Sequence, residues 1–267
     1  MIGGVSRRRT FLLAGSLIAS LAVVTLAVSM WKRGAIDGSR MGVGSEEIKF
    51  EGRTFVVVEP DLRQVSIRLF WKRPDGSRYS TFENVRTQLA NSHERLIFAT
   101  NAGIYGRDFT PLGLHVESGQ ELVPLNLQEG KGNFYMQPNG VFFVDGTGPQ
   151  IVRSPEYRGT HPGIRLAAQS GPMLVIDGTI SPQFQPDSKS EWIRSGVGIG
   201  PDGRLVFAIS REPVTFYEFA SLFRSRLKCR RALYLDGTIS RFWPASEKRA
   251  PSPGEFAGII AVSRPEE

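Results

Sequence analysis

Short stretches in which apolar and polar residues alternate recur along the chain and predict a fold built mainly from β-strands. Apolar side chains occupy every second position from Val65 to Trp71, and this run ends at the Asp75-Gly76 pair, as in a half-buried strand that leads into a turn. Asp-Gly lies between apolar runs in three further stretches, residues 140–152, 172–180 and 197–210. We therefore expect several hairpins.

Two segments have helical rather than alternating patterns. The weaker one runs from Thr81 to Ala90. The stronger one is TFYEFASLFRSRL, residues 215–227, in which Thr215 and Glu218 have the spacing of a capping box. Its aromatic residues recur at helical spacing, so we expect one face of this helix to pack in the core.

The second helix leads into ALYL, residues 232–235, whose nearly continuous apolar character predicts a strand buried on both faces. Together these patterns predict an α+β fold: a single strand-rich domain with a mixed, largely antiparallel sheet, several hairpins and a few helices packed on it. LDGTIS at 235–240 almost repeats IDGTIS at 176–181. Asp177 fits a turn, whereas Asp236 follows the buried strand, a place where α/β proteins often carry their sites.

The N-terminus predicts export from the cytoplasm. Arg7-Arg8-Arg9 precedes residues 11–29, which contain no charged residue. The order Arg8-Arg9-Thr10-Phe11-Leu12 resembles a twin-arginine export signal, but the apolar run is also long enough to cross a ~30 Å hydrocarbon core. We expect residues 1–33 to be an export signal or membrane anchor, 34–45 a linker and 46–265 the domain. That domain would be periplasmic or extracytoplasmic, and anchored to the inner membrane through residues 11–29 if these are not cleaved.

Charge and cysteine content narrow the function classes. The net charge is +7, but three of the arginines precede the apolar segment and the other basic residues are scattered, so we expect no nucleic-acid partner. Cys229 is the single cysteine, which leaves no intramolecular disulfide and predicts a small buried side chain. The sequence has no metal-ligand spacing of histidines, no Gly-x-Ser-x-Gly elbow and no phosphate-binding glycine loop, which argues against zinc- and nucleotide-dependent chemistry.

Polar residues suited to a site gather in four places along the chain. Each place alone also fits an ordinary loop, turn or surface salt bridge. The candidates are Asn101, Tyr105 and Asp108 in TNAGIYGRDFTPLGL, Asn133 and Asn139 in GNFYMQPNGVFF, Gln169 and Ser170 in QSGPM, and Arg194 before SGVGIG.

Taken in order, these four blocks and ALYLDGTIS resemble the phosphodiester glycosidase family, in particular its exported bacterial branch of mostly uncharacterised proteins. The resemblance covers residues 46–263. It implies hydrolysis of a sugar-1-phosphodiester in cell-envelope or extracellular glycans, with a carbohydrate phosphate as the substrate. One departure is that Thr238-Ile239-Ser240 stand where the family usually has further glycines and a serine.

The residue types suggest how such a reaction would be divided among them. A phosphate ester is already a good leaving group, so one carboxylate and one cation can suffice, whereas an ordinary glycoside also needs an acid. We assign Asp236 as general base or nucleophile and Arg194 as the phosphate clamp, because a planar guanidinium can hold two phosphate oxygens. Asp108 is the second carboxylate, either an auxiliary acid or a ligand of a sugar hydroxyl. The expected substrate ligands are Asn101, Tyr105, Asn133, Asn139, Gln169, Ser170 and Gly237.

Two alternatives stay open at this stage. The same polar groups suit a non-catalytic periplasmic module that binds glycan or assists envelope assembly. No cofactor is required by the sequence, although acidic turn residues such as Asp236 are suited to help ligate a divalent cation such as calcium.

Overall fold

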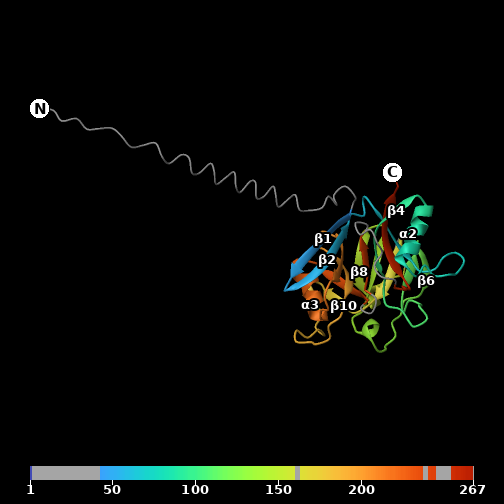
Figure 1. The fold of residues 1–267 in the computed structure, drawn as a ribbon. Helices are drawn as coiled ribbons and strands as arrows, with labels where there is room; N and C mark the ends of the chain where they lie inside the picture. The colour runs from blue at the N-terminus through green and yellow to red at the C-terminus, as the bar shows by residue number, and fades with distance from the viewer. Residues whose placement is uncertain (2–42, 160–162, 237–239, 245–253, 267) are drawn as a thin grey trace. The chain divides into compact units, whose positions relative to one another are not determined.

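Three β-sheets make up the folded part of the chain (Figure 1). This computed structural model describes residues 1, 43–159, 163–236, 240–244 and 254–266. The chain divides into two units, Met1–Gly38 and Ser39–Glu267, and the description below concerns the second. Apart from Met1, the predicted export segment lies outside the described residues, as does most of the predicted linker.

The largest sheet has seven strands in the order β1-β2-β13-β12-β14-β10-β11. Their bounds are β1 Val43–Phe50, β2 Arg53–Pro60, β10 Met173–Ile176, β11 Thr179–Ile180, β12 Ser195–Ile199, β13 Leu205–Ser210 and β14 Arg231–Asp236. The predicted buried strand 232–235 is confirmed as β14, which lies between β12 and β10.

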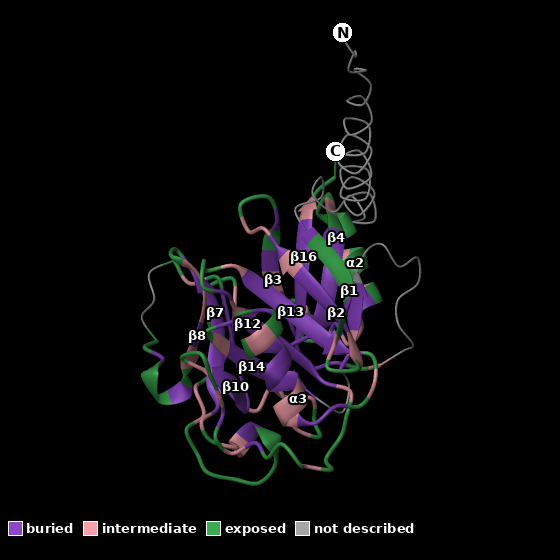
Figure 2. Cartoon of the chain, turned by 90° about the vertical axis from the view of Figure 1, so that its left-hand side faces the viewer, coloured by how far each residue is buried: buried purple, intermediate pink, exposed green. Residues whose placement is uncertain are grey.

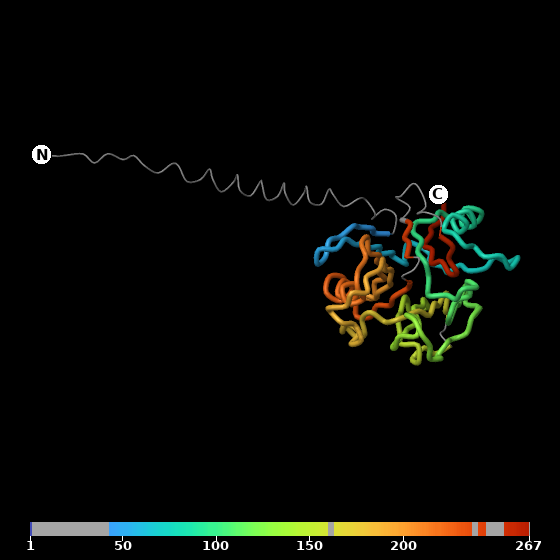
Figure 3. Tube along the Cα trace, turned by 60° about the horizontal axis from the view of Figure 1, so that its bottom comes forward, coloured from blue at the N-terminus to red at the C-terminus, as the bar shows by residue number. Residues whose placement is uncertain are grey.

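Two smaller sheets complete the fold. One has the order β15-β4-β16-β3 and the other β6-β5-β9-β7-β8. Their bounds are β3 Ser66–Phe70, β4 Glu94–Asn101, β15 Phe242–Pro244 and β16 Ile259–Pro265 for the four-stranded sheet, and β5 His115–Glu117, β6 Gln120–Val123, β7 Gly140–Asp145, β8 Gly148–Arg153 and β9 Leu166–Ser170 for the five-stranded one. Figure 3 shows β16, in red, among segments far from it in sequence, because it pairs with both β3 and β4.

The expectation of a strand-rich fold with antiparallel pairing and few helices is confirmed. The expectation of one mixed sheet is wrong in detail, because there are three sheets and each strand pair between described residues is antiparallel. The physical reason is that most pairs join strands distant in sequence, and such pairing leaves no local signal.

Both predicted helices are present. α2 spans Phe82–Asn91, and the Thr81 hydroxyl accepts a hydrogen bond from the amide of Asn84. α3 spans Phe216–Ser221 and begins with the predicted capping box between Thr215 and Glu218. Its expected second half is instead a π-helical turn, η4 Leu222–Arg226. Two short 3-10 turns, η2 Asn133–Tyr135 and η3 Ser154–Glu156, lie in loops.

The apolar core joins all three sheets. One cluster of buried side chains includes Val58 of β2, Phe98 of β4, Phe142 of β7 and Leu233 of β14. A second cluster packs α3 onto the other face of the largest sheet. Most of the strand ribbon in Figure 2 is accordingly coloured as buried. β14 is therefore covered on both faces, as its apolar sequence predicted.

The twin Asp-Gly segments differ as the sequence suggested. Asp177 and Gly178 both have positive φ, 49° and 86°, and form the tight turn between β10 and β11. This is the backbone that a type I′ hairpin turn requires. Asp236 instead ends a strand. No helix among the described residues is long and apolar enough to span a membrane, and residues 11–29 are not among them.

Candidate functional site

The candidate site is centred on the carboxyl end of β14, where the ladder with β12 is irregular. Gly196 pairs with Tyr234 and Ser195 pairs with Asp236, so Leu235 is an extra residue on β14. Such an irregularity bends the strand and leaves backbone groups outside the regular ladder. Because of this irregularity, the backbone carbonyl groups of Leu235 and Asp236 need hydrogen-bond donors from outside the ladder.

Serine hydroxyls supply those partners. Ser170 Oγ, at the end of β9, donates to the Leu235 carbonyl at 2.9 Å. Ser195 Oγ donates to the Asp236 carbonyl at 3.3 Å, and Ser240 Oγ donates to the same oxygen. The backbone that carries the Asp236 carboxylate is thus held from three segments.

Asn101, at the end of β4, connects this network to the four-stranded sheet. It is 2% exposed, and its Nδ2 donates to Ser195 Oγ at 3.1 Å. Its Oδ1 accepts from the amide of Arg241 at 3.2 Å. Asn101 and Ser170, which the sequence suggested as substrate ligands, therefore hold the strand end that bears Asp236.

Asp236 is itself nearly buried, with 7% of its surface exposed. Its negative charge acts on two tyrosines. Burial, reinforced by this charge, raises the pKa of Tyr105 to about 12. Burial also raises the pKa of Tyr234 well above its usual value, with a smaller contribution from Asp236 in the same direction. Tyr105 donates from Oη to the Glu255 carbonyl at 3.2 Å.

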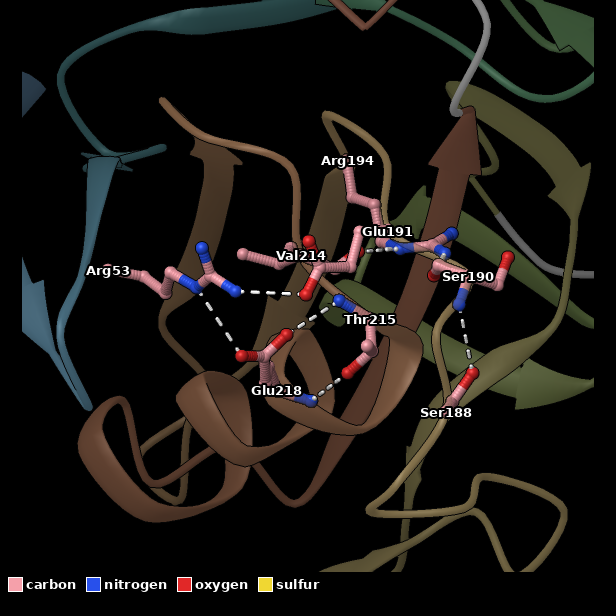
Figure 4. A network of polar contacts seen from close by, with 8 residues as sticks. All are labelled: Arg53, Ser188, Ser190, Glu191, Arg194, Val214, Thr215 and Glu218. Carbon is pink, nitrogen blue, oxygen red and sulfur yellow. Dashed lines mark hydrogen bonds and ion pairs between the residues drawn. The ribbon is translucent and has the colours of Figure 1, made fainter.

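Arg194 is buried immediately before β12, with 1% exposure (Figure 4). Its Nε donates to the Val214 carbonyl at 2.8 Å and its Nη2 to the Ser190 carbonyl at 3.0 Å. Its Cζ lies 3.7 Å from the centroid of the Phe216 ring. Burial lowers the pKa of this guanidinium. Desolvation is costly for a charge, so such groups normally have a charged partner.

The acids near Arg194 are committed elsewhere. Arg53 bonds Glu191 at 3.0 Å and Glu218 at 3.4 Å, and Glu218 also caps α3 through the Thr215 amide (Figure 4). Among the described residues, no carboxylate forms an ion pair with Arg194. The alternative interpretation of Arg194 was a surface salt bridge. Within the described residues, Arg194 forms no such salt bridge.

Three other candidates are occupied by local structure. Asp108 is exposed and accepts from the amide and hydroxyl of Thr110, which lowers its pKa. Asn139 Nδ2 donates to the Phe134 carbonyl at 3.0 Å. The Gln169 amide bonds to the backbone of Leu114 and Asn126 and to the hydroxyl of Ser154. These contacts account for Asn139 and Gln169 without a ligand.

The remaining candidates differ in what can be described. Asn133 is exposed at the start of η2, and Gly237 lies outside the described residues.

In the described segments, no three His, Cys, Asp or Glu side chains are grouped to hold a metal ion. A surface hollow of about 250 Å³, lined by residues that include Asp177 and Arg231, lies at the opposite end of β14 from Asp236 and is separate from this site.

Sequence reasoning missed three residues of this site. Ser195 directly follows the candidate Arg194, and Ser240 ends the LDGTIS segment, so both were adjacent to recognised positions. Tyr234 was counted only as part of an apolar strand. Its position in the strand that leads directly to Asp236 was the available signal.

Comparison with known proteins now identifies the family. The family model described as "Phosphodiester glycosidase" matches residues 94–251. "Uncharacterized protein YigE" of Escherichia coli strain K12 is 35% identical over 250 residues, which cover 94% of this chain and 96% of that protein. The chain belongs to the phosphodiester glycosidase family. The matched range includes each candidate site residue from Asn101 to Gly237.

Two solved structures have folds similar to the one seen here. The catalytic domain of zebrafish N-acetylglucosamine-1-phosphodiester alpha-N-acetylglucosaminidase, auto-inhibited by its pro-peptide, superimposes with a TM-score of 0.57 and 13% identity, covering 82% of this chain and 81% of that one. A "Putative exported protein" of Burkholderia pseudomallei K96243 has a TM-score of 0.51 and 11% identity, with 79% and 74% covered. At these identities the likeness concerns the fold.

Proposed function

We propose that this protein is an exported hydrolase that cleaves the glycosidic bond of a sugar-1-phosphodiester in cell-envelope or extracellular glycans. The observation that carries the proposal is that a nearly buried carboxylate, Asp236, ends β14 and pairs with Ser195, whose chain neighbour Arg194 is a buried guanidinium that forms no ion pair with a carboxylate of the described residues. Burial raises the pKa of Tyr234, Arg194 lowers it and Asp236 raises it. Family membership supplies the reaction class.

The reaction needs few protein groups. Water attacks the anomeric carbon as the bond from that carbon to the phosphate oxygen breaks, which yields the free sugar and a phosphate monoester. Asp236 takes the proton from the water as general base, or attacks the carbon first as the nucleophile of a two-step route. Arg194 holds the phosphate and stabilises the charge that it gains as it leaves.

The other residues divide into positioning and binding roles. Asn101, Ser170, Ser195 and Ser240 fix the backbone at Leu235 and Asp236. Tyr105, Asn133 and the Gly237 amide remain our proposed substrate ligands. Asp108, exposed in its own turn, is proposed as the auxiliary acid or as a ligand of a sugar hydroxyl.

Substitution of the proposed catalytic carboxylate tests this function. We expect Asp236→Asn to lower turnover of sugar-1-phosphodiesters by at least about 10³-fold, because the amide can neither take a proton nor attack carbon. The assay follows release of reducing sugar and of methyl phosphate from methyl diesters of several sugar 1-phosphates, with the full chain. Asp202→Asn is the matched control, since Asp202 is an exposed acid that caps its own turn by accepting from the Arg204 amide. Unchanged turnover by Asp236→Asn on every sugar tested would overturn the mechanism.

A non-catalytic glycan-binding module is the second candidate. Trp192, two residues before Arg194, is 59% exposed and offers an aromatic surface of the kind that mediates binding. Glycan binding by the unmodified chain without sugar release from any diester would favour this module over the hydrolase.

The proposed location rests on the N-terminus. Residues 7–29 have the pattern of an export signal or anchor, and the B. pseudomallei neighbour is described as exported. Cell fractionation with protease added from the periplasmic side tests the location and also distinguishes cleavage from anchoring by the mass of the protein.

A further inference from the structure

The stretch that leads from η4 into β14 carries a group of exposed basic side chains. Arg224, Arg226, Lys228 and Arg230 are all exposed, and we call these four residues the basic cluster. Residues 219–235 contain no acidic residue. The cluster is therefore an exception to the scattered distribution of basic residues that the sequence suggested.

Strand pairing and side-chain bonds place the basic cluster at the end of the largest sheet where β1 begins. Gly44 of β1 pairs with Glu59 of β2. Glu59 forms an ion pair with Arg204, whose Nη2 donates to the Leu227 carbonyl, inside the cluster, at 2.9 Å. Since β14 starts beside the cluster and ends at Asp236, the candidate site lies at the opposite end of this sheet.

The charges of the basic cluster are not neutralised by neighbouring acids. Within the described part of the chain, none of its four side chains forms an ion pair or a hydrogen bond. The acids at this end of the sheet bind other arginines, because Glu59 and Asp202 pair with Arg204 and Asp177 pairs with Arg231. Exposed charges of one sign create a potential that attracts a surface of the opposite sign.

The chain that precedes β1 connects this end of the sheet to the predicted export signal or anchor. Residues 30–42 join the apolar run 11–29 to Val43. Fully extended, such a segment spans at most about 45 Å. If the apolar run stays in the membrane, the start of β1 therefore lies within this distance of the bilayer. Anionic phospholipids attract Lys and Arg side chains, and each such cation near the surface strengthens binding about fivefold.

We propose that the basic cluster docks the folded domain onto a membrane surface that contains anionic phospholipids. The contact is electrostatic, because the stretch 224–230 exposes basic side chains and buries its Leu227 and Cys229. It is a second contact, separate from any insertion of residues 11–29, and an apolar anchor combined with a basic patch holds a protein firmly on a membrane. The proposal does not depend on the hydrolase activity.

Docking through the basic cluster also fixes the orientation of the candidate site. β14 spans six residues, from Arg231 beside the cluster to Asp236. A strand of this length extends roughly 20 Å. The docked domain therefore holds Asp236 on the side away from the bilayer, where it is accessible to material in the space outside the membrane.

Acetylation of two lysines in the full chain tests the proposal. Lys228 reports on the basic cluster, and Lys49, exposed near the other end of β1, is the reference within the same molecule. The chain is mixed with vesicles of phosphatidylcholine alone or with an equal part of phosphatidylglycerol, and mass spectrometry follows both acetylation rates. We expect the anionic vesicles to slow the acetylation of Lys228 about fivefold or more relative to Lys49 at low salt. About 1 M salt, at which the Debye length is ~3 Å, should remove this difference.

A double variant supplies the second measurement. Arg224→Gln combined with Arg226→Gln should bring the acetylation rate of Lys228 with anionic vesicles to within about twofold of the rate with neutral vesicles, because two of the four cations are lost. Lys131→Gln combined with Lys189→Gln is the matched control: it makes the same change in net charge at two exposed positions outside the cluster and should leave the protection of Lys228 unchanged. The comparison of lipids and salt needs no variant, so it remains decisive if the double variant misfolds.

The outcomes are distinct from those that test the hydrolase. Equal acetylation of Lys228 with anionic and neutral vesicles, or protection that persists in the folded double variant, overturns the proposal. Protection of Lys228 by soluble heparin but not by anionic vesicles also overturns it, because the cluster would then bind acidic polysaccharides. None of these results depends on sugar release, which the Asp236→Asn variant tests separately.

Discussion

Asn101 illustrates, at the scale of single residues, how this site is held together. Its side chain spans from β4 to Ser195 and to the Arg241 amide, so it joins two sheets and the segment that follows β14. A short polar side chain with one donor and one acceptor end can serve partners of both kinds at once. The candidate catalytic carboxylate thus depends on a neighbour that need not touch the substrate.

Asn101→Ala should therefore lower both stability and activity. It removes a partner of the buried Ser195 hydroxyl and of the partly buried Arg241 amide, at a cost of about 1–3 kcal/mol. Urea unfolding measures the loss of stability, and turnover at saturating substrate measures the misplacement of Asp236. Asn91→Ala, at an exposed position ending α2, is the control and should change neither. Wild-type stability in Asn101→Ala would contradict the positioning role.

At the scale of elements, the glycines of β12 allow α3 to pack closely against the largest sheet. A Cβ added at Gly198 would lie 2.7 Å from Cys229 Sγ and 2.7 Å from Phe223 Cδ1. One at Gly196 would lie 3.1 Å from Phe219. The small residues of SGVGI are thus the surface on which the aromatic face of α3 and η4 rests. β12 also carries Ser195, so this packing supports the site.

Gly198→Ala should accordingly destabilise the protein by about 1–3 kcal/mol, because the added methyl overpacks a filled core. The midpoint of chemical unfolding measures the effect. Gly44→Ala on β1, where the nearest atom to a new Cβ is 3.9 Å away, is the matched control. A destabilisation no larger than that of Gly44→Ala would show that the interface between β12 and α3 can relax.

Stability at the scale of the whole molecule comes from the shared apolar core, since the single cysteine allows no internal disulfide. Cys229 is 2% exposed, and burial raises the pKa of its thiol to about 12. The thiol therefore stays neutral and enclosed at pH 8, where a free cysteine is partly ionised.

Two measurements follow for the unmodified chain. The melting temperature should be the same with and without dithiothreitol. Ellman's reagent should react with Cys229 at pH 8 only as fast as the core opens, so that the rate rises steeply near the urea midpoint. Rapid reaction under native conditions would contradict the burial of this residue.

Local patterns explain what the sequence could predict. The two helices follow from their caps and apolar spacing, and the turn at Asp177 and the strand before Asp236 follow from turn chemistry and apolar character. The division into three sheets depends on pairs such as β16 with β3, whose strands are far apart in the sequence. No local rule encodes such pairing.

The same limit applied to the candidate site. Asn139 and Gln169 have side chains suited to a ligand, and only the folded structure shows that these side chains form hydrogen bonds with backbone groups. Tyr234 resembles an ordinary apolar strand residue until the structure places Arg194 beside its ring. The residue types predicted which side chains are able to bind or act on a substrate. The tertiary contacts determine which of these side chains are available to do so.

The irregular ladders on both sides of β14 have a consequence for protein engineering. Its register shifts against β12 between Ser195 and Gly196, and against β10 between Met173 and Val175. The geometry of Asp236 is therefore a joint property of three strands rather than of the LDGTIS segment. A graft of that segment alone into another scaffold would restore the regular alternation and turn the carboxylate away, so a transplant of this chemistry has to carry β10, β12 and β14 together.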